Sequence, residues 1–262
     1  MRPRTPARSP RQRAGNDPAS RLPAFAALAA AMGIVGTSVT ANKFIVGQAP
    51  VFLASTIRFL IASVVLVVLV RLVEGRLPRL PLRVHALLIA QALAGIVAFN
   101  ALLLVGLGMT TATISGIITA ATPAVIALLS VAMGERLGRA GWLGVMLAFA
   151  GVIVVNLLAA PATSEAPRPL LGGTLVVLAV IGEALYTILG KTIAGRLSPL
   201  ATATLVSLYG ALLFVPLAAW DLRAAAATGI PAHAWLAILY LALVVTVVAF
   251  ALWFKGLQTI PA

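Results

Sequence analysis

Residues 98–112 read AFNALLLVGLGMTTA, and residues 249–262 read AFALWFKGLQTIPA. Both stretches begin with Ala-Phe, run through apolar residues to Gly-Leu, and then change to small and hydroxylated residues. The likeness indicates an internal repeat in which Ala262, the last residue, corresponds to Ala112. Both copies are strongly apolar, so the repeated element belongs in a nonpolar environment.

The composition indicates that this environment is a membrane. The chain of 262 residues is 61% hydrophobic and 10% charged, with a mean hydropathy of +1.09, whereas soluble domains carry about 25% charged residues. We therefore predict an integral membrane protein. The chain has no cysteine and only two histidines, His85 and His233, so neither a disulfide framework nor a histidine metal centre is expected, and no cofactor is indicated.

Eight apolar runs approach the ~20 residues that cross a bilayer core of ~30 Å. They fall at residues 23–46, 51–73, 85–107, 111–133, 141–160, 171–190, 199–220 and 235–257. Their apolar character is continuous rather than alternating, which favours helices over the strands of a membrane barrel. The sequence therefore predicts an all-α membrane protein with eight transmembrane helices.

The basic residues predict the orientation of these helices. If the helices simply alternate, fifteen basic residues fall on one side, and only Arg168 and Arg223 fall on the other. The fifteen are Arg2, Arg4, Arg8, Arg11, Arg13, Arg21, Arg71, Arg76, Arg79, Arg83, Arg136, Arg139, Lys191, Arg196 and Lys255. Such a bias predicts a cytoplasmic N-terminus in a bacterial inner membrane. It also accounts for the net charge of +13 without a nucleic-acid partner.

The chain divides into four parts. Residues 1–22 are basic and rich in Pro and Ser, which is typical of a disordered cytoplasmic tail; a cleaved signal peptide is the alternative. Residues 23–160 form a first five-helix repeat, residues 161–170 a periplasmic linker, and residues 171–262 a second, incomplete repeat of three helices.

The repeat extends to further residues. Lys43, at the end of the first apolar run, matches Lys191 at the end of the sixth, and Pro50 matches Pro199. Five helices separate the copies, and an odd number of crossings turns the second copy over. Inverted repeats of this kind are a recurring plan of secondary transporters, with the solute site near the midplane between the halves.

Several motifs resemble the EamA-type transporters of the drug/metabolite transporter superfamily. The stretches are GTSVTANKFI at 36–45, STIRFLIAS at 55–63, and the long run from 110 to 155. The matching positions are Lys43, Arg58 with Phe59, Thr122 with Pro123, Gly134 with Glu135, and Trp142 to Gly144. The likeness covers about residues 23–262 and is weaker in the second half, where Glu183 stands at a position that is usually uncharged.

This resemblance implies ten helices in two five-helix halves, so helices nine and ten are expected to be absent from this chain. It also implies a secondary transporter, not an enzyme, that exports a small organic solute or metabolite by alternating access. Two alternatives remain open from the sequence: a non-transporting membrane scaffold, and a membrane enzyme acting on lipid-linked substrates. The expected partners are the solute, the lipid bilayer and a proton as coupling ion; a homodimer is left open, and no nucleic acid is expected.

Two charged residues lie deep in the predicted helices. Arg58 is about eight residues into its run, or ~12 Å at 1.5 Å per residue, where an arginine is costly unless it faces a cavity or a partner. Glu183 is the deep carboxylate and could act as a proton-coupling group or as a structural partner for a cation. We predict that Arg58 and Glu183 face one cavity; the alternative for Arg58 is snorkelling to the surface.

Other residues complete the candidate pathway. Asn100, Tyr186, Trp253 and Lys43 could contact the solute, although each could instead bond a neighbouring helix or, for Lys43, snorkel. Pro123 predicts a helix kink, because it removes a backbone hydrogen bond. Glu135 is expected to pair with nearby arginines.

Overall fold

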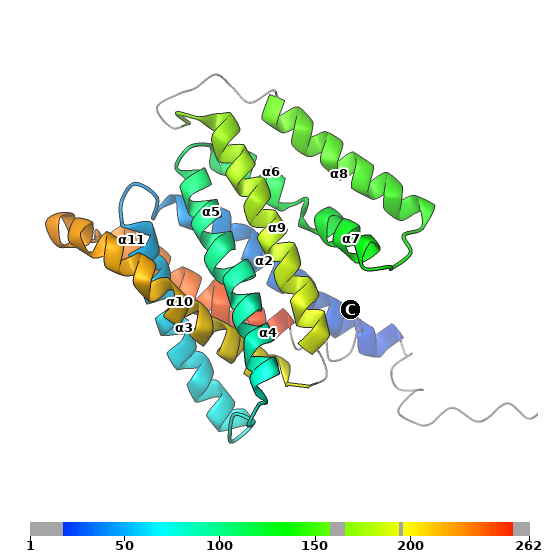
Figure 1. The fold of residues 1–262 in the computed structure, drawn as a ribbon, viewed down its shortest axis with the longest axis horizontal. Coiled ribbons are helices and arrows are strands. Elements are labelled where there is room, and N and C mark those ends of the chain that lie inside the picture. The colour runs from blue at the N-terminus through cyan, green and yellow to red at the C-terminus, as the bar shows by residue number, and fades with distance from the viewer. Residues whose placement is uncertain (1–17, 158–165, 194–195, 254–262) are drawn as a thin grey trace, which may run out of the picture.

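The computed structural model describes residues 18–157, 166–193 and 196–253 (Figure 1). All long elements in these residues are helices, and two segments, labelled η, are wider π-helices. The elements are α2 (Pro18–Lys43), α3 (Val51–Val73), α4 (Leu82–Ala92), η1 (Leu93–Ala98), α5 (Phe99–Leu107), α6 (Ala112–Thr119), α7 (Thr122–Ala132), α8 (Arg139–Leu157), α9 (Pro169–Ile193), α10 (Pro199–Thr228), α11 (Ala232–Tyr240) and η2 (Leu241–Val248).

Seven helices of the described chain are long and apolar enough to cross a membrane. They run over Leu22–Lys43, Val51–Val73, Leu82–Leu107, Ala112–Ala132, Pro169–Ile193, Pro199–Leu222 and Ala232–Trp253. The predicted span at 141–160 differs, because its apolar part within the described residues is the shorter helix Arg139–Val154. Helix α8 itself runs on to Leu157, and residues 158–160 of this span lie outside the described residues, so its crossing stays a prediction. Figure 1 shows α8 at the edge of the bundle, beside α7.

Two helices also begin earlier in the structure than the sequence predicts. Helix α2 begins at Pro18, inside the stretch 1–22 that the sequence predicts as a tail. Helix α9 begins at Pro169, inside the predicted linker 161–170. Residues 1–17 and 158–165 lie outside the described residues, so the rest of both predictions falls there.

Polar contacts bring one set of helix ends together at what we call the basic end. Ser198, before α10, donates to Glu74 after α3 at 2.8 Å. Lys191, near the end of α9, lies 3.6 Å from Glu135, which follows α7. The ends of α3, α7 and α9 therefore share one side of the bundle, as alternating crossings require.

A second set of contacts forms the opposite end. The Lys43 ammonium donates to the carbonyls of Leu107 at 2.9 Å and Thr110 at 3.1 Å. The backbone N–H of Phe52, in the first turn of α3, donates to the Asp221 carboxylate at 2.8 Å. Each contact satisfies backbone groups that a helix terminus leaves free.

Helix α9 packs tightly along the helix formed by α4, η1 and α5. A Cβ added to Gly106 would lie 2.8 Å from the carbonyl oxygen of Gly172, and one on Gly182 would lie 2.7 Å from that of Ala94. Small residues let membrane helices approach this closely, and dispersion contacts then hold them together. These glycines account for the close approach of the two helices.

Helices α3 and α10 make an extensive contact between the two halves, with the rings of Phe59 and Phe214 stacked 6.0 Å apart. Helix α3 also packs on η2, and α10 packs on η1. In the sequence repeat α3 corresponds to α10, and the helix with η1 corresponds to the helix with η2. These contacts follow the repeat, whereas the contact of α9 with α4, η1 and α5 has no equally extensive counterpart at α2.

The π-helical segments occupy matching places in that repeat. Segment η1 ends at Ala98, directly before Phe99, and η2 ends directly before Ala249 and Phe250. The hydropathy pattern predicts both as ordinary helix. π-Helical turns are rare and often lie at functional sites, which directs attention to the residues around them.

The predicted fourth span is divided into α6 and α7, with a turn at residues 120–121. Pro123 lies in the first turn of α7, where its missing N–H costs little. The Thr122 hydroxyl lies 2.7 Å from the Thr119 carbonyl, which proline leaves without a backbone donor. The helix break is therefore held by a side chain.

Candidate functional site

Arg58 lies where the two halves meet. Its Nη1 donates to Asn100 Oδ1 on α5 at 3.1 Å, and its Nη2 donates to Thr246 Oγ1 on η2 at 3.3 Å. Arg58 and Asn100 come from the first half of the repeat, and Thr246 comes from the second. One guanidinium thus joins helices of both halves.

The π-helical segments orient both acceptors. The amide nitrogen of Asn100 donates to the Ile96 carbonyl at 2.7 Å, within η1. The Thr246 hydroxyl donates to the Leu241 carbonyl, five residues back, at 2.9 Å. One amide hydrogen of Asn100 and the hydroxyl hydrogen of Thr246 are thus directed at backbone carbonyls, and the oxygens of both side chains accept from Arg58.

The Arg58 charge has no counter-charge in the described structure. Asn100 and Thr246 are neutral, and no described carboxylate forms an ion pair with the guanidinium. Its Nε is buried and has no acceptor among the described residues. The Phe59 ring lies 4.9 Å from its Cζ, so an aromatic face supplies part of the surroundings.

Glu183 lies on α9 opposite the break between α6 and α7. Its Oε2 is 2.9 Å from the hydroxyl of Thr122. That hydroxyl is also 2.7 Å from the Thr119 carbonyl, although a hydroxyl has one hydrogen to donate. Glu183 is therefore linked through Thr122 to the point where the helix is interrupted.

Arg58 and Glu183 are thus bound by different neutral partners. Within the described residues there is neither a hydrogen bond nor an ion pair between them. That they face one cavity stays a prediction.

The other candidate residues have separate surroundings. Lys43 is bound to helix-end carbonyls at the opposite end of the bundle. Tyr186 packs against Gly95, and its carbonyl accepts from the Gln91 side chain at 3.1 Å. Trp253 is half-buried at the end of the described chain. Of the uncharged candidates, Asn100 is the one that contacts Arg58.

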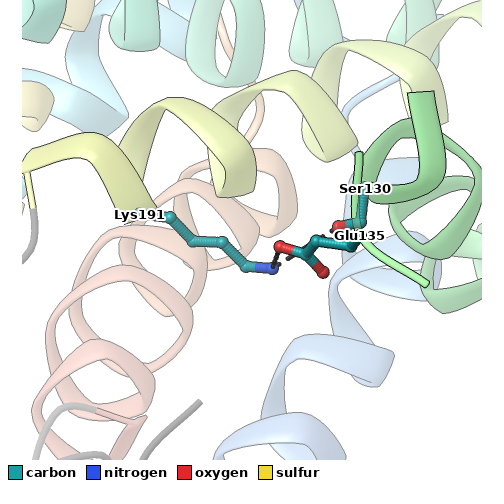
Figure 2. Close-up of polar contacts among 3 residues, drawn as sticks. All are labelled: Ser130, Glu135 and Lys191. Carbon is teal, nitrogen blue, oxygen red and sulfur yellow. Dashed lines mark hydrogen bonds and ion pairs between the residues drawn. The ribbon is translucent and has the colours of Figure 1, made fainter. Parts of the chain in front are cut away.

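A hollow of about 250 Å³ opens at the basic end. It is lined by Pro123, Ile126, Ala127, Ser130, Val131, Glu135, Arg136, Leu137 and Lys191. Figure 2 shows Lys191 reaching from α9 toward Glu135 and Ser130, at 3.6 and 3.5 Å. Glu135, expected to pair with arginines, pairs with Lys191 instead, because the ends of α7 and α9 lie together.

Sequence reasoning missed Thr246 as a contact of Arg58 and Thr122 as the contact of Glu183. Thr246 is the one hydroxyl in the run from 241 to 250, just before the repeated Ala-Phe, and that placing is the signal that could have found it. Thr122 stands directly before Pro123. No cluster of metal-binding side chains occurs among the residues that the structure describes.

The bundle and the deep polar groups define a multi-pass helical membrane protein. The model of the EamA-like transporter family matches residues 22–157 and 170–262. The chain belongs to this family, a family of transporters and not of enzymes. The earlier resemblance is thereby confirmed.

Two Bacillus subtilis (strain 168) proteins are similar to this chain. "Uncharacterized transporter YetK" is 41% identical over 243 residues, which cover 92% of this chain and 74% of that protein. "Uncharacterized transporter YyaM" is 26% identical over 230 residues, covering 87% of this chain and 75% of that protein. No solved structure matches.

Proposed function

We propose that this protein is a secondary transporter that exports a small organic solute by alternating access. The observation that carries the proposal is Arg58, which is bound at once to Asn100 in the first half and to Thr246 in the second. The hydrogen bonds of a deep cation that joins two halves would change when the halves move relative to each other. A solute bound there would become accessible first from one side of the membrane and then from the other.

We further propose that the halves are inverted five-helix repeats, with the N-terminus in the cytoplasm of the inner membrane. The exchanged packing of α3 on η2 and α10 on η1 supports the repeat. The excess of basic residues on one side supports the orientation. Because the chain has no cysteine, single cysteines at Gln48 and Gly138 provide a clean test. Labelling from outside is expected at position 48 and not at position 138.

The proposal includes a proton as coupling ion, carried by Glu183. A protonated Glu183 can donate to Thr122, which then donates to Thr119, so both short contacts are hydrogen bonds. An ionised Glu183 must compete with the Thr119 carbonyl for the single hydroxyl hydrogen. Gaining or losing the proton would therefore change how α9 holds the break between α6 and α7.

Flux from proteoliposomes tests the transport proposal. Vesicles holding the purified chain are loaded with a mixture of amino acids, organic acids and amines, and release is followed by mass spectrometry. We expect at least one solute to leave faster than from empty vesicles, and Arg58→Ala to abolish that flux. Arg71→Ala, on the same helix but exposed, is the control. Release no faster than from empty vesicles would contradict the proposal.

Glu183→Gln tests the coupling ion. Glutamine retains a donor for Thr122 but cannot titrate, so we expect residual flux that no longer depends on the proton gradient. Flux that keeps its full pH dependence in this variant would exclude Glu183 as the coupling group and leave the transport proposal intact.

A further inference from the structure

We infer that Arg58 is the binding group for the oxyanion of the solute, so the transported class is organic anions such as carboxylates. This inference rests on the proposed function, because it names the solute class of that transporter. It starts from the charges of the described chain, which leave Arg58 without a negative partner.

Every described carboxylate is already engaged elsewhere. Glu74 accepts from Ser198, and Glu135 pairs with Lys191. Glu183 is bound to Thr122. Asp221 accepts from the backbone N–H of Phe52 at the start of α3.

The two remaining acids, Asp17 and Glu165, lie outside the described residues and outside the predicted helices. Within the described residues, no carboxylate is therefore placed to balance the charge of Arg58. A cation deep in the membrane is costly when it is unpaired, so an anionic solute would lower that cost by binding.

The guanidinium also has donors to spare. It carries five N–H groups, and the structure uses two of them, toward Asn100 and Thr246. Nε is among the unused groups and is shielded from solvent without an acceptor. A carboxylate accepts two parallel N–H groups from one arginine, which matches what Arg58 lacks.

The neighbours of Arg58 disfavour a cationic solute. One amide hydrogen of Asn100 and the hydroxyl hydrogen of Thr246 are held by Ile96 and Leu241, and the oxygens of both side chains already accept from Arg58. An ammonium group would find a positive charge and no free carboxylate among the described residues there. The charge of the site therefore favours an anionic over a cationic solute.

Binding of matched acid–amide pairs tests the inference on the purified 262-residue chain. The probes are benzoate with benzamide and hexanoate with hexanamide, measured by the shift in thermal unfolding temperature and by flux in vesicles. We expect at least one acid to stabilise the protein and its amide to have no effect. Arg58→Gln should weaken acid binding ~10-fold or more, as expected for lost hydrogen bonds to a charged group.

Asn100→Asp is the sharper variant, because it places a carboxylate where the amide oxygen now lies 3.1 Å from Arg58. It should abolish stabilisation by acids while the unfolding temperature of the free protein stays equal or rises. Arg71→Gln, an exposed arginine on the same helix, should bind acids like the wild type. If Arg58→Gln does not fold, Asn100→Asp alone decides.

The outcomes separate this inference from the transport proposal. Amides that stabilise as well as acids, acids that do not stabilise the wild type, or full acid binding by Asn100→Asp would overturn the anion class. If acids bind through Arg58 but do not cross the vesicle membrane, the anion site stands and the transport proposal fails. If neutral solutes cross while acids neither bind nor cross, transport stands and the anion class is rejected.

Discussion

Helices α2 and α9 are the first helices of the two repeats, yet they have different surroundings. In the apolar segment of α9, 44% of the residues are buried, compared with 22% in α2. A Cβ on Gly182 of α9 would meet the Ala94 carbonyl oxygen at 2.7 Å, whereas one on Gly36 of α2 would meet nothing within 4 Å in the described structure.

A repeated sequence therefore specifies the same helix twice without specifying the same packing. Helix α9 lies against α4, η1 and α5 as one unit, while α2 makes smaller contacts with α6, η2 and α11. Small residues bring helices close only where a partner lies opposite them. We therefore expect α9 to contribute most of the stability and α2 to tolerate change.

The largest expected effect comes from one substitution made in both helices. Gly182→Leu should destabilise the protein by about 1–3 kcal/mol or more, because the added side chain meets backbone and the helices must separate. Gly36→Leu should be neutral or slightly stabilising, because leucine is the better helix former. Thermal unfolding in detergent measures both, and equal losses would remove the distinction between the helices.

Lys43 and Lys191 are equivalent in the repeat, and for this pair we expect the larger loss of stability at Lys43, in α2. Lys43 donates to two helix-end carbonyls, and Lys43→Met should cost about 1.5–3 kcal/mol, the usual range for bonds to a charged group. Lys191 and Glu135 are both exposed, so Lys191→Met should cost less than about 1 kcal/mol and lose even that in high salt. Denaturant unfolding at two salt concentrations compares them, and a larger loss for Lys191 would contradict this assignment.

A smaller difference should separate two hydrogen bonds between helices. Thr122→Val removes the partly buried link to Glu183 and Thr119 and should cost about 1 kcal/mol. Tyr240→Phe removes the exposed contact between Tyr240 and Thr37 of α2, 2.6 Å long, and should cost no more than about 0.5 kcal/mol. Unfolding temperatures that fall equally in the two variants would show that α2 is held as firmly as α9.

Much of the fold was predictable from apolar runs alone. Seven of the expected spans and their approximate boundaries follow from the length of uninterrupted apolar sequence, because a helix needs that length to cross a bilayer core. Arg58, Glu183 and Asn100 could be singled out for the same reason, since polar groups are costly in that setting. The span at 141–160 is described only in part, because its residues 158–160 lie outside the described residues, and that it crosses stays a prediction.

The amino-acid sequence was enough to infer a membrane protein with an internal repeat and to single out the deep residues that require partners. Which residues serve as those partners depends on how the helices pack. Thr246 reaches Arg58 from 188 positions away through a π-helical segment that no apolar pattern distinguishes from an α-helix. Glu183 is bound by Thr122 because α9 lies beside an interrupted helix. Hydropathy indicates which residues lie in the membrane. The neighbours of a residue depend on how the helices pack, and that packing depends on residues distributed over the whole chain.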